Sequence, residues 1–276
     1  MNKLKMALVA ALALPSFHVL AEDAPEAKSD YSVSYNIGLF SQYIFRGYTQ
    51  TNGDPALQGG VDVEHSSGFY VGAWASNISW LEDTNSYSHG GSLELDLYAG
   101  FAGEIGDTGI SYDVGFLQYL YPGDVAPGYA KANTTEAHIG LGYGWFDAAV
   151  HVVTSDTAWT WGDARGTAYY EINAEVPIGD LVDYKYLSGV TANFHAGYQD
   201  FAGHPVYAPP VGKYDNEVDS YADWKIGLNK NFADSGIDMG WYYTGTDTRH
   251  DGWFIRYDEG RIYSDPTHTF YLTKSF

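Results

Sequence analysis

Residues 93–101 of the chain read LELDLYAGF, and their pattern indicates the fold. Its apolar residues stand at every second position, with Glu94 and Asp96 between them. Successive side chains of a β-strand point to opposite faces, so the alternation predicts a strand with one apolar and one polar face.

The same period of two recurs along the chain, without a convincing helical period after the first residues. We predict twelve strands, which begin near Val33, Leu57, Phe69, Leu93, Ile110, Ala137, Phe146, Ala168, Val190, Ala222, Ile237 and Thr267. The chain is therefore predicted to be all-β.

The connections between these segments alternate in length, beginning with a long one. The long connections are 47–56, 81–91, 122–135, 156–166, 200–220 and 245–266. The short ones are 66–68, 104–108, 145–146, 177–188 and 233–236, of which 177–188 is the longest.

This alternation separates two all-β architectures. A soluble β-sandwich also has short alternating strands, but its loops have no reason to alternate in length. Bacterial outer-membrane barrels have short periplasmic turns, long outer loops and an even number of strands. We therefore predict a single up-and-down antiparallel transmembrane β-barrel of twelve strands in a Gram-negative outer membrane, with both termini periplasmic.

The apolar faces and the end of the chain predict the partners of such a barrel. Outward apolar residues would face outer-membrane lipid and lipopolysaccharide. Phe270, Leu272 and the terminal Phe276 share one face, which is typical of strands recognised by the barrel assembly machinery, although Lys274 interrupts that face. Aromatic residues near segment ends are expected in the headgroup zone. They are Tyr43, Phe45, Trp74, Trp80, Trp145, Tyr198, Trp241 and Tyr243.

The first residues have the layout of a secretory signal. Lys3 and Lys5 precede an apolar run from Met6 to Leu14, and Val19-Leu20-Ala21 offers a cleavage site. We expect cleavage after Ala21, so that residues 1–21 are a signal peptide and residues 22–276 form the barrel.

Composition excludes several other classes of protein. With 35 acidic and 14 basic residues, the net charge of −21 argues against nucleic-acid binding. The chain has no cysteine, which excludes disulfide scaffolds and thiolate zinc sites. A mean hydropathy of −0.27 is too polar for a bundle of membrane helices.

Several short motifs resemble one known family. They are SQYIFRG at 41–47, DPALQGG at 54–60, SGFYVG at 67–72, YDVG at 112–115, YLYPG at 119–123, YADWK at 221–225 and LTKSF at 272–276. Together these motifs resemble the TorF family of porins (the Gcw_chp family) across essentially the whole mature chain. The resemblance implies an outer-membrane barrel called a porin mostly by shape, with no known substrate and no established catalytic residues.

The polar faces of the predicted strands are acidic. The residues expected to line the lumen are Arg46, Asp62, Glu64, Glu94, Asp96, Asp113, Glu136, His138, Asp147, Glu171, Glu175, Asp223, Lys225 and Asp238. Only Arg46 and Lys225 are clear inward cations. Carboxylates along a channel attract cations, so we predict passive passage of small solutes, favouring cations or neutral molecules.

The alternative is that the same carboxylates pair with Arg46 and Lys225 in a plugged barrel. The chain would then be a closed structural or adhesive barrel whose long loops bind a partner. Arg46 ends the first predicted strand, near the outer mouth. There it would either define a constriction or anchor the first loop through a salt bridge. The sixth loop, with Arg249, His250, Arg256 and Arg261, is expected to be a solvated external loop, with an inward gate or a site for acidic cell-surface sugars as alternatives. The same alternatives apply to the fifth loop, with His204-Pro205 and Pro209-Pro210.

A lipid-modifying enzyme is the least favoured function. His138 and His151 are expected to be neighbours across a hairpin, with Glu136 and Asp147 beside them. The sequence has no Gly-x-Ser-x-Gly or His-Glu-x-x-His motif, and no third partner completes a triad. We therefore predict no catalytic residues, no cofactor and no metal.

Overall fold

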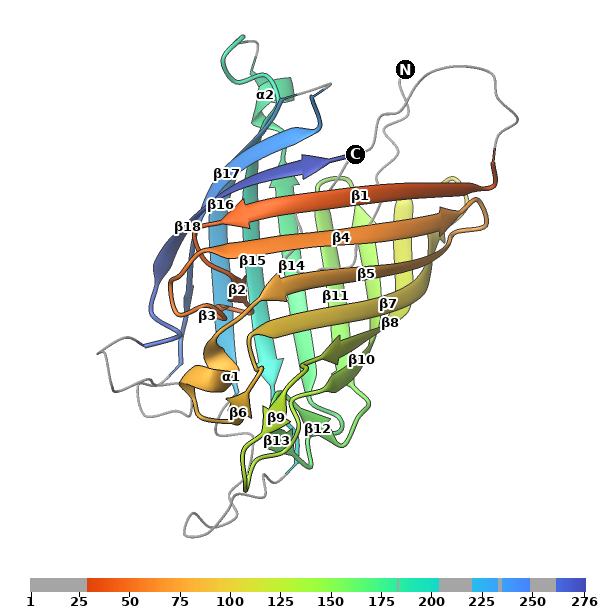
Figure 1. The fold of residues 1–276 in the computed structure, drawn as a ribbon. Coiled ribbons are helices and arrows are strands. Elements are labelled where there is room, and N and C mark those ends of the chain that lie inside the picture. The colour runs from red at the N-terminus through yellow and green to blue at the C-terminus, as the bar shows by residue number, and fades with distance from the viewer. Residues whose placement is uncertain (1–28, 183, 204–219, 233–234, 249–261) are drawn as a thin grey trace.

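The computed structural model describes residues 29–182, 184–203, 220–232, 235–248 and 262–276, and within them twelve strands form one closed antiparallel barrel (Figure 1). The strands are β1 (Tyr31–Phe40), β4 (Ala56–His65), β5 (Phe69–Asn77), β7 (Leu93–Glu104), β8 (Ile110–Leu120), β10 (Thr134–Tyr143), β11 (Phe146–Val153), β14 (Ala168–Val176), β15 (Val190–Asp200), β16 (Tyr221–Asn231), β17 (Ile237–Thr246) and β18 (Thr267–Ser275). Each pairs with the barrel strands next to it in sequence. The predicted fold class, strand number and up-and-down order are confirmed.

The first and last strands close the barrel. In β1, Leu39 lies opposite Leu57 of β4 on one side and Leu272 of β18 on the other. Closure leaves no strand edge with unpaired backbone groups, which is what a sheet surrounded by hydrocarbon requires.

The remaining elements lie in the connections. They are β2 (Ile44–Phe45), β3 (Tyr48–Thr49), α1 (Trp80–Asp83), β6 (Tyr87–His89), β9 (Asp124–Val125), β12 (Thr157–Ala158), β13 (Trp161–Gly162) and α2 (Ile178–Leu181). All but α2 belong to long connections, and these elements gather at one end of the barrel (Figure 1). We call this the long-loop end and the opposite one the short-turn end.

The connection lengths alternate as predicted except between β14 and β15, where the connection 177–189 is as long as loop 3. The long connections run over 41–55 (loop 1), 78–92 (loop 2), 121–133 (loop 3), 154–167 (loop 4), 201–220 (loop 5) and 247–266 (loop 6). Loop 1 starts six residues earlier than expected, because β1 ends at Phe40 and the chain then turns away from the barrel wall. Most of loops 5 and 6, with all the basic and proline residues singled out in them above, lies outside the described residues.

The outer surface of the barrel is apolar. Leu39, Phe116, Ile139 and Phe270 keep 57%, 60%, 54% and 61% of their surface exposed. These residues alternate with buried or half-buried ones, as strands with two different faces require. Phe276 also faces outward, and Lys274 places its Nζ 5.1 Å from the centre of the Phe276 ring. None of the described helices is long and apolar enough to cross a membrane.

Aromatic side chains from the loops and strands fill the long-loop end. The largest members of this buried cluster are Phe40, Tyr43, Trp74, Trp80, Tyr87, Tyr119, Tyr121, Trp159, Trp161, Phe201, Tyr221 and Tyr263. Tyr43, Trp74 and Trp80 were expected in the headgroup zone, and this expectation is wrong for all three, as it is for Phe45, which packs against the same cluster. Periodicity places a residue on a strand face but does not show that a loop folds back over it.

Exposure of the lumen side chains rises toward the short-turn end. Along β7, Glu94 and Asp96 are each 1% exposed, Tyr98 is half-buried and Glu104 is exposed. On β4, Gln58 is buried, Asp62 is half-buried and Glu64 is exposed. Water therefore reaches the lumen from the short-turn end, whereas the described residues close it at the long-loop end.

Candidate functional site

A tight hairpin carries Arg46 into the lumen. In loop 1, β2 pairs with β3 through Phe45 and Tyr48, leaving Arg46 and Gly47 as the two turn residues. Both have positive φ, 44° and 83°, as a two-residue hairpin turn requires. A side chain at Gly47 would clash with Thr246 and Asp223, so this position needs glycine. Arg46 thus lies at the tip of a hairpin rather than at the end of the first strand, which corrects the expected position.

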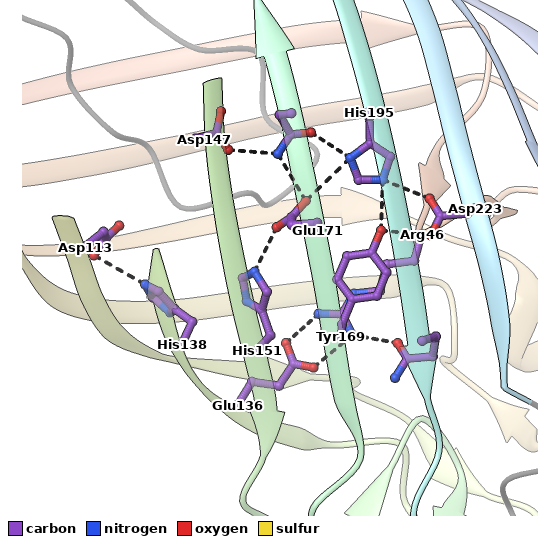
Figure 2. A network of polar contacts seen from close by, with 12 residues as sticks. Arg46, Asp113, Glu136, His138, Asp147, His151, Tyr169, Glu171, His195 and Asp223 are labelled. Carbon is purple, nitrogen blue, oxygen red and sulfur yellow. Dashed lines mark hydrogen bonds and ion pairs between the residues drawn. The ribbon is translucent and has the colours of Figure 1, made fainter. Parts of the chain in front are cut away.

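The Arg46 guanidinium reaches the opposite wall of the barrel (Figure 2). Its Nη1 donates to Glu136 Oε1 at 3.0 Å and to Gln199 Oε1 at 2.9 Å, while its Nη2 donates to Glu136 Oε2 at 2.8 Å. Glu136 is on β10 and Gln199 on β15, whereas loop 1 leaves the barrel from β1. The hairpin therefore crosses the lumen and is fastened on its far side.

Aromatic rings enclose the same guanidinium. Its Cζ lies 4.2 Å from the ring centre of Tyr169, 4.8 Å from that of Phe45 and 5.2 Å from that of Trp159. Cation–π attraction adds to the ion pair, and more strongly in a desolvated site. The Tyr119 hydroxyl also donates to Glu136 Oε2 at 3.0 Å, so the carboxylate is bonded on both oxygens.

Further contacts hold loop 1 in the lumen. The Tyr43 hydroxyl donates to Glu94 Oε1 at 3.1 Å, and the Tyr221 hydroxyl donates to the Arg46 carbonyl oxygen at 2.9 Å. Burial, and then the charge of Glu94, raises the pKa of Tyr43 well above its usual range. Tyr43 is therefore protonated at neutral pH and acts as the donor.

Next to the contacts of Arg46 with Glu136 and Gln199, here called the Arg46 tether, histidines and carboxylates form pairs along the barrel wall. His138 and His151 are cross-strand neighbours with ring centres 5.5 Å apart, as expected. Their partners differ from those expected: His138 Nε2 lies 3.3 Å from Asp113 Oδ1, and His151 Nε2 lies 2.9 Å from Glu171 Oε1. Glu136 bonds to Arg46 instead, and Asp147 accepts a hydrogen bond from Asn173 at 2.9 Å.

His195 joins these pairs to the Arg46 tether. Its Nε2 is 2.9 Å from both Asp223 Oδ1 and the Tyr169 hydroxyl, and its Nδ1 is 2.7 Å from Asn173 Oδ1 (Figure 2). Tyr169 also donates to Asp223 Oδ2 at 2.9 Å, so one tyrosine contacts both the guanidinium and the His195 network.

The structure places the other expected lumen residues at different depths. Asp62 accepts a hydrogen bond from the Tyr98 hydroxyl, Glu64 is exposed, and Glu175 and Lys225 are half-buried. Asp238 accepts from Asn231 at 3.1 Å. Asp96 is buried, and neither of its carboxylate oxygens has a hydrogen-bond partner within the described part of the chain.

Sequence reasoning did not single out four residues that build this site. Tyr119, Tyr169, His195 and Gln199 all occupy inward positions of the two-residue period. That period could have shown their face. Their importance comes from an arginine on a distant loop, which no local pattern reveals.

The site shows no metal-binding arrangement. Across the described ranges, no group of three or more His, Asp or Glu side chains is placed to hold a metal ion. The histidines are instead bonded to carboxylates, asparagine and tyrosine.

Solved structures with a similar fold include several outer-membrane channels. A KdgM porin is 8% identical, covering 88% of this chain and 98% of its own, with a TM-score of 0.47. The COG4313 outer membrane channel from Pseudomonas putida F1 is 10% identical, covering 94% and 100%, with a TM-score of 0.45. OccK5 (OpdH) from Pseudomonas aeruginosa is 12% identical, covering 88% and 67%, with a TM-score of 0.39. These similarities are too low to carry an argument about function.

The sequence comparisons assign the chain to a family. No curated protein matches the chain. A family model does match, over residues 24–276, and its description is "Bacterial protein of unknown function (Gcw_chp)". This match agrees with the Gcw_chp resemblance of the motifs, while the TorF porin label stays a prediction. The chain therefore belongs to the Gcw_chp family of bacterial proteins.

Proposed function

We propose that this protein is an outer-membrane channel of a Gram-negative bacterium that passes small solutes, favouring cations or neutral molecules. The short-turn end and both termini would face the periplasm, and the long loops would face outward. The many exposed apolar side chains on the outer surface of the barrel, here called the apolar belt, support a membrane location, since proteins in water avoid large exposed apolar patches. Outer-membrane lipid and lipopolysaccharide would cover the belt, and the strand ending at Phe276 would be recognised by the barrel assembly machinery.

The acidic lumen is the observation that carries the solute preference. Asp62, Glu64, Asp147, Glu175 and Asp238 are half-buried or exposed on the lumen face toward the short-turn end. Among the Lys and Arg residues of the described barrel strands, Lys225 is the one that lies on the lumen face. An excess of carboxylates raises the local concentration of cations and repels anions.

The Arg46 hairpin would block this channel in its closed state. It crosses the lumen and packs through Phe45 against the aromatic cluster, so passage requires the hairpin to move from the far wall. Breaking the Arg46–Glu136 ion pair leaves a buried charge without a partner, and this keeps the closed state favoured.

Conductance across a planar bilayer under a KCl gradient tests the proposal. We expect small or intermittent current from the wild-type protein and larger current from Arg46→Gly, in both cases with a cation-selective reversal potential. Arg165→Ala is the matched control, because Arg165 forms an exposed pair with Asp156 at 2.8 Å and should conduct as the wild type does. Silence from folded wild type and folded Arg46→Gly would overturn the channel.

A closed barrel whose long loops bind a partner is the second candidate. It is favoured by one observation: the buried aromatic cluster joins residues of several long loops into one packed layer across the barrel. Such a layer would present a rigid outer surface. Absence of current from both proteins, with a partner captured by the intact barrel and lost when the loops are shortened, would support this function.

The geometry gives no support to a lipid-modifying enzyme. His138 and His151 are 7% and 3% exposed, and both pair with carboxylates on the lumen side. Neither lies at the lipid-facing rim that such chemistry would need. The expected signal peptide at residues 1–21 lies outside the described residues and remains part of the proposal.

A further inference from the structure

We propose that the cage around Arg46 is a binding site for the guanidinium group of solutes, and that Arg46 is its internal occupant in the closed state. The inference rests on the proposed function only for passage of such solutes. Binding itself requires only the cage residues outside the hairpin and can be measured without current.

Most of the cage belongs to the barrel rather than to the hairpin. Glu136, Tyr169 and Gln199 lie on β10, β14 and β15, and Trp159 lies in loop 4. Only Phe45 moves with Arg46, because both belong to the hairpin of loop 1. Displacing the hairpin therefore leaves a carboxylate, an amide oxygen and two aromatic rings in place.

The geometry of these groups matches a guanidinium, which is planar and presents two parallel N–H donors. Two nitrogens of Arg46 donate to the two oxygens of Glu136, at 3.0 and 2.8 Å, while the Tyr169 ring centre lies 4.2 Å from the central carbon. A guanidinium satisfies the carboxylate and stacks on a ring at the same time. An alkylammonium has three donors at a single point and cannot bond both oxygens in this parallel way.

The charge of the wall also requires an occupant. Glu136 is 1% exposed, and Arg46 is the cation that neutralises it. Leaving a buried carboxylate without a cation destabilises the protein by roughly several kcal/mol, even when neutral hydrogen-bond donors remain. Once the hairpin leaves, a solute that carries a guanidinium group is favoured to replace it.

The hairpin is suited to such an exchange. A competing guanidinium can occupy the cage only when the Arg46 side chain has left it, so a bound solute and an open hairpin support each other. In this way the bound solute would also open the channel.

Isothermal titration calorimetry of the folded barrel in detergent tests the site, with ethylguanidinium and ethylammonium chloride as probes. Arg46→Gly is the informative variant, because glycine accepts the positive φ and the cage loses its occupant. We expect Arg46→Gly to bind ethylguanidinium about ten-fold more tightly than ethylammonium, since only the former makes the bidentate contact. The wild type and Arg165→Ala should bind it more weakly than Arg46→Gly, because Arg46 competes.

Three results would overturn the inference. They are equal affinity of Arg46→Gly for the two probes, undiminished affinity after Glu136→Gln is added, and no gain in affinity over the wild type. Should Arg46→Gly not fold, Arg46→Lys replaces it, because the lysine ammonium fills the cage less well than the guanidinium. Ethylguanidinium should then bind to Arg46→Lys more tightly than to the wild type. Binding without conductance would leave this site standing and overturn the channel, and conductance without binding would do the reverse.

Discussion

Arg46 and Glu136 are 90 residues apart in sequence, yet their side chains meet at 2.8 Å and are 6% and 1% exposed. By the shorter way round the barrel, four strands separate β1, from which loop 1 departs, from β10, which carries Glu136. One ion pair thus joins the first long loop to the far wall, and the lumen is closed between them.

This buried pair should be strongly coupled. Arg46→Ala and Glu136→Gln should each lower the free energy of unfolding by about 3 kcal/mol, because each leaves a buried charge alone. The double variant should lose less than the sum of the two. Urea unfolding followed by tryptophan fluorescence measures all three. Arg165→Ala, which breaks an exposed pair, should change stability by less than about 0.5 kcal/mol. Strict additivity would show that the two residues do not act together.

Tyr169 depends on a glycine of the next strand. Its ring and hydroxyl lie where a side chain at Gly197 would be, and that side chain would also meet Asp223 Oδ2. Gly197→Ala should therefore displace Tyr169 and destabilise the barrel by about 1–3 kcal/mol. Gly162→Ala is the matched control, since no atom lies within 4 Å of the added carbon there. Equal thermal stability of the two variants would contradict the packing described for Tyr169.

The rise in lumen exposure toward the short-turn end predicts the reactivity of introduced thiols. The chain has no cysteine of its own, so each substitution gives a single site. On the lumen face, Ser34 is half-buried near the short-turn end, and Ser76 is 1% exposed near the other. A charged maleimide should label Ser34→Cys at a rate near that of the exposed turn position Ser188→Cys, and Ser76→Cys far more slowly. Rapid labelling of Ser76→Cys would mean that the long-loop end is open.

Charge reversal near the short-turn end should change ion selectivity. In a conducting protein, Asp62→Lys together with Glu64→Lys should move the reversal potential toward anions, because these carboxylates face accessible lumen. Asp180→Lys, an exposed site on α2 outside the lumen, makes a single reversal that should have little effect. An unchanged reversal potential in the double variant would refute selectivity by lumen charge.

Local sequence was sufficient to predict the barrel. The alternation in segments such as 93–101 predicts the face on which each side chain lies, because the period of a strand is two. The approximate length of each connection also follows from the sequence. The acidic face of Glu94, Asp96 and Glu136 followed from the same alternation.

The sequence also implied that His138 and His151 would meet, since the turn between their strands is short and fixes the register. It did not predict that His138 pairs with Asp113 and His151 with Glu171, which belong to the next strands on either side. Those contacts depend on which long side chains reach across the pleat, and they required coordinates.

The barrel wall could be predicted from the chain alone, because strand number, order, facing and charge are properties of neighbours along it. The content of the lumen required the coordinates, including the path of loop 1, the burial of Tyr43 and Trp74, and the cage around Arg46. This difference follows from the closure of the barrel. Only when β1 pairs with β18 do residues from opposite sides of the sheet face one another, and a loop can then bond to a strand with which its own chain neighbours make no contact.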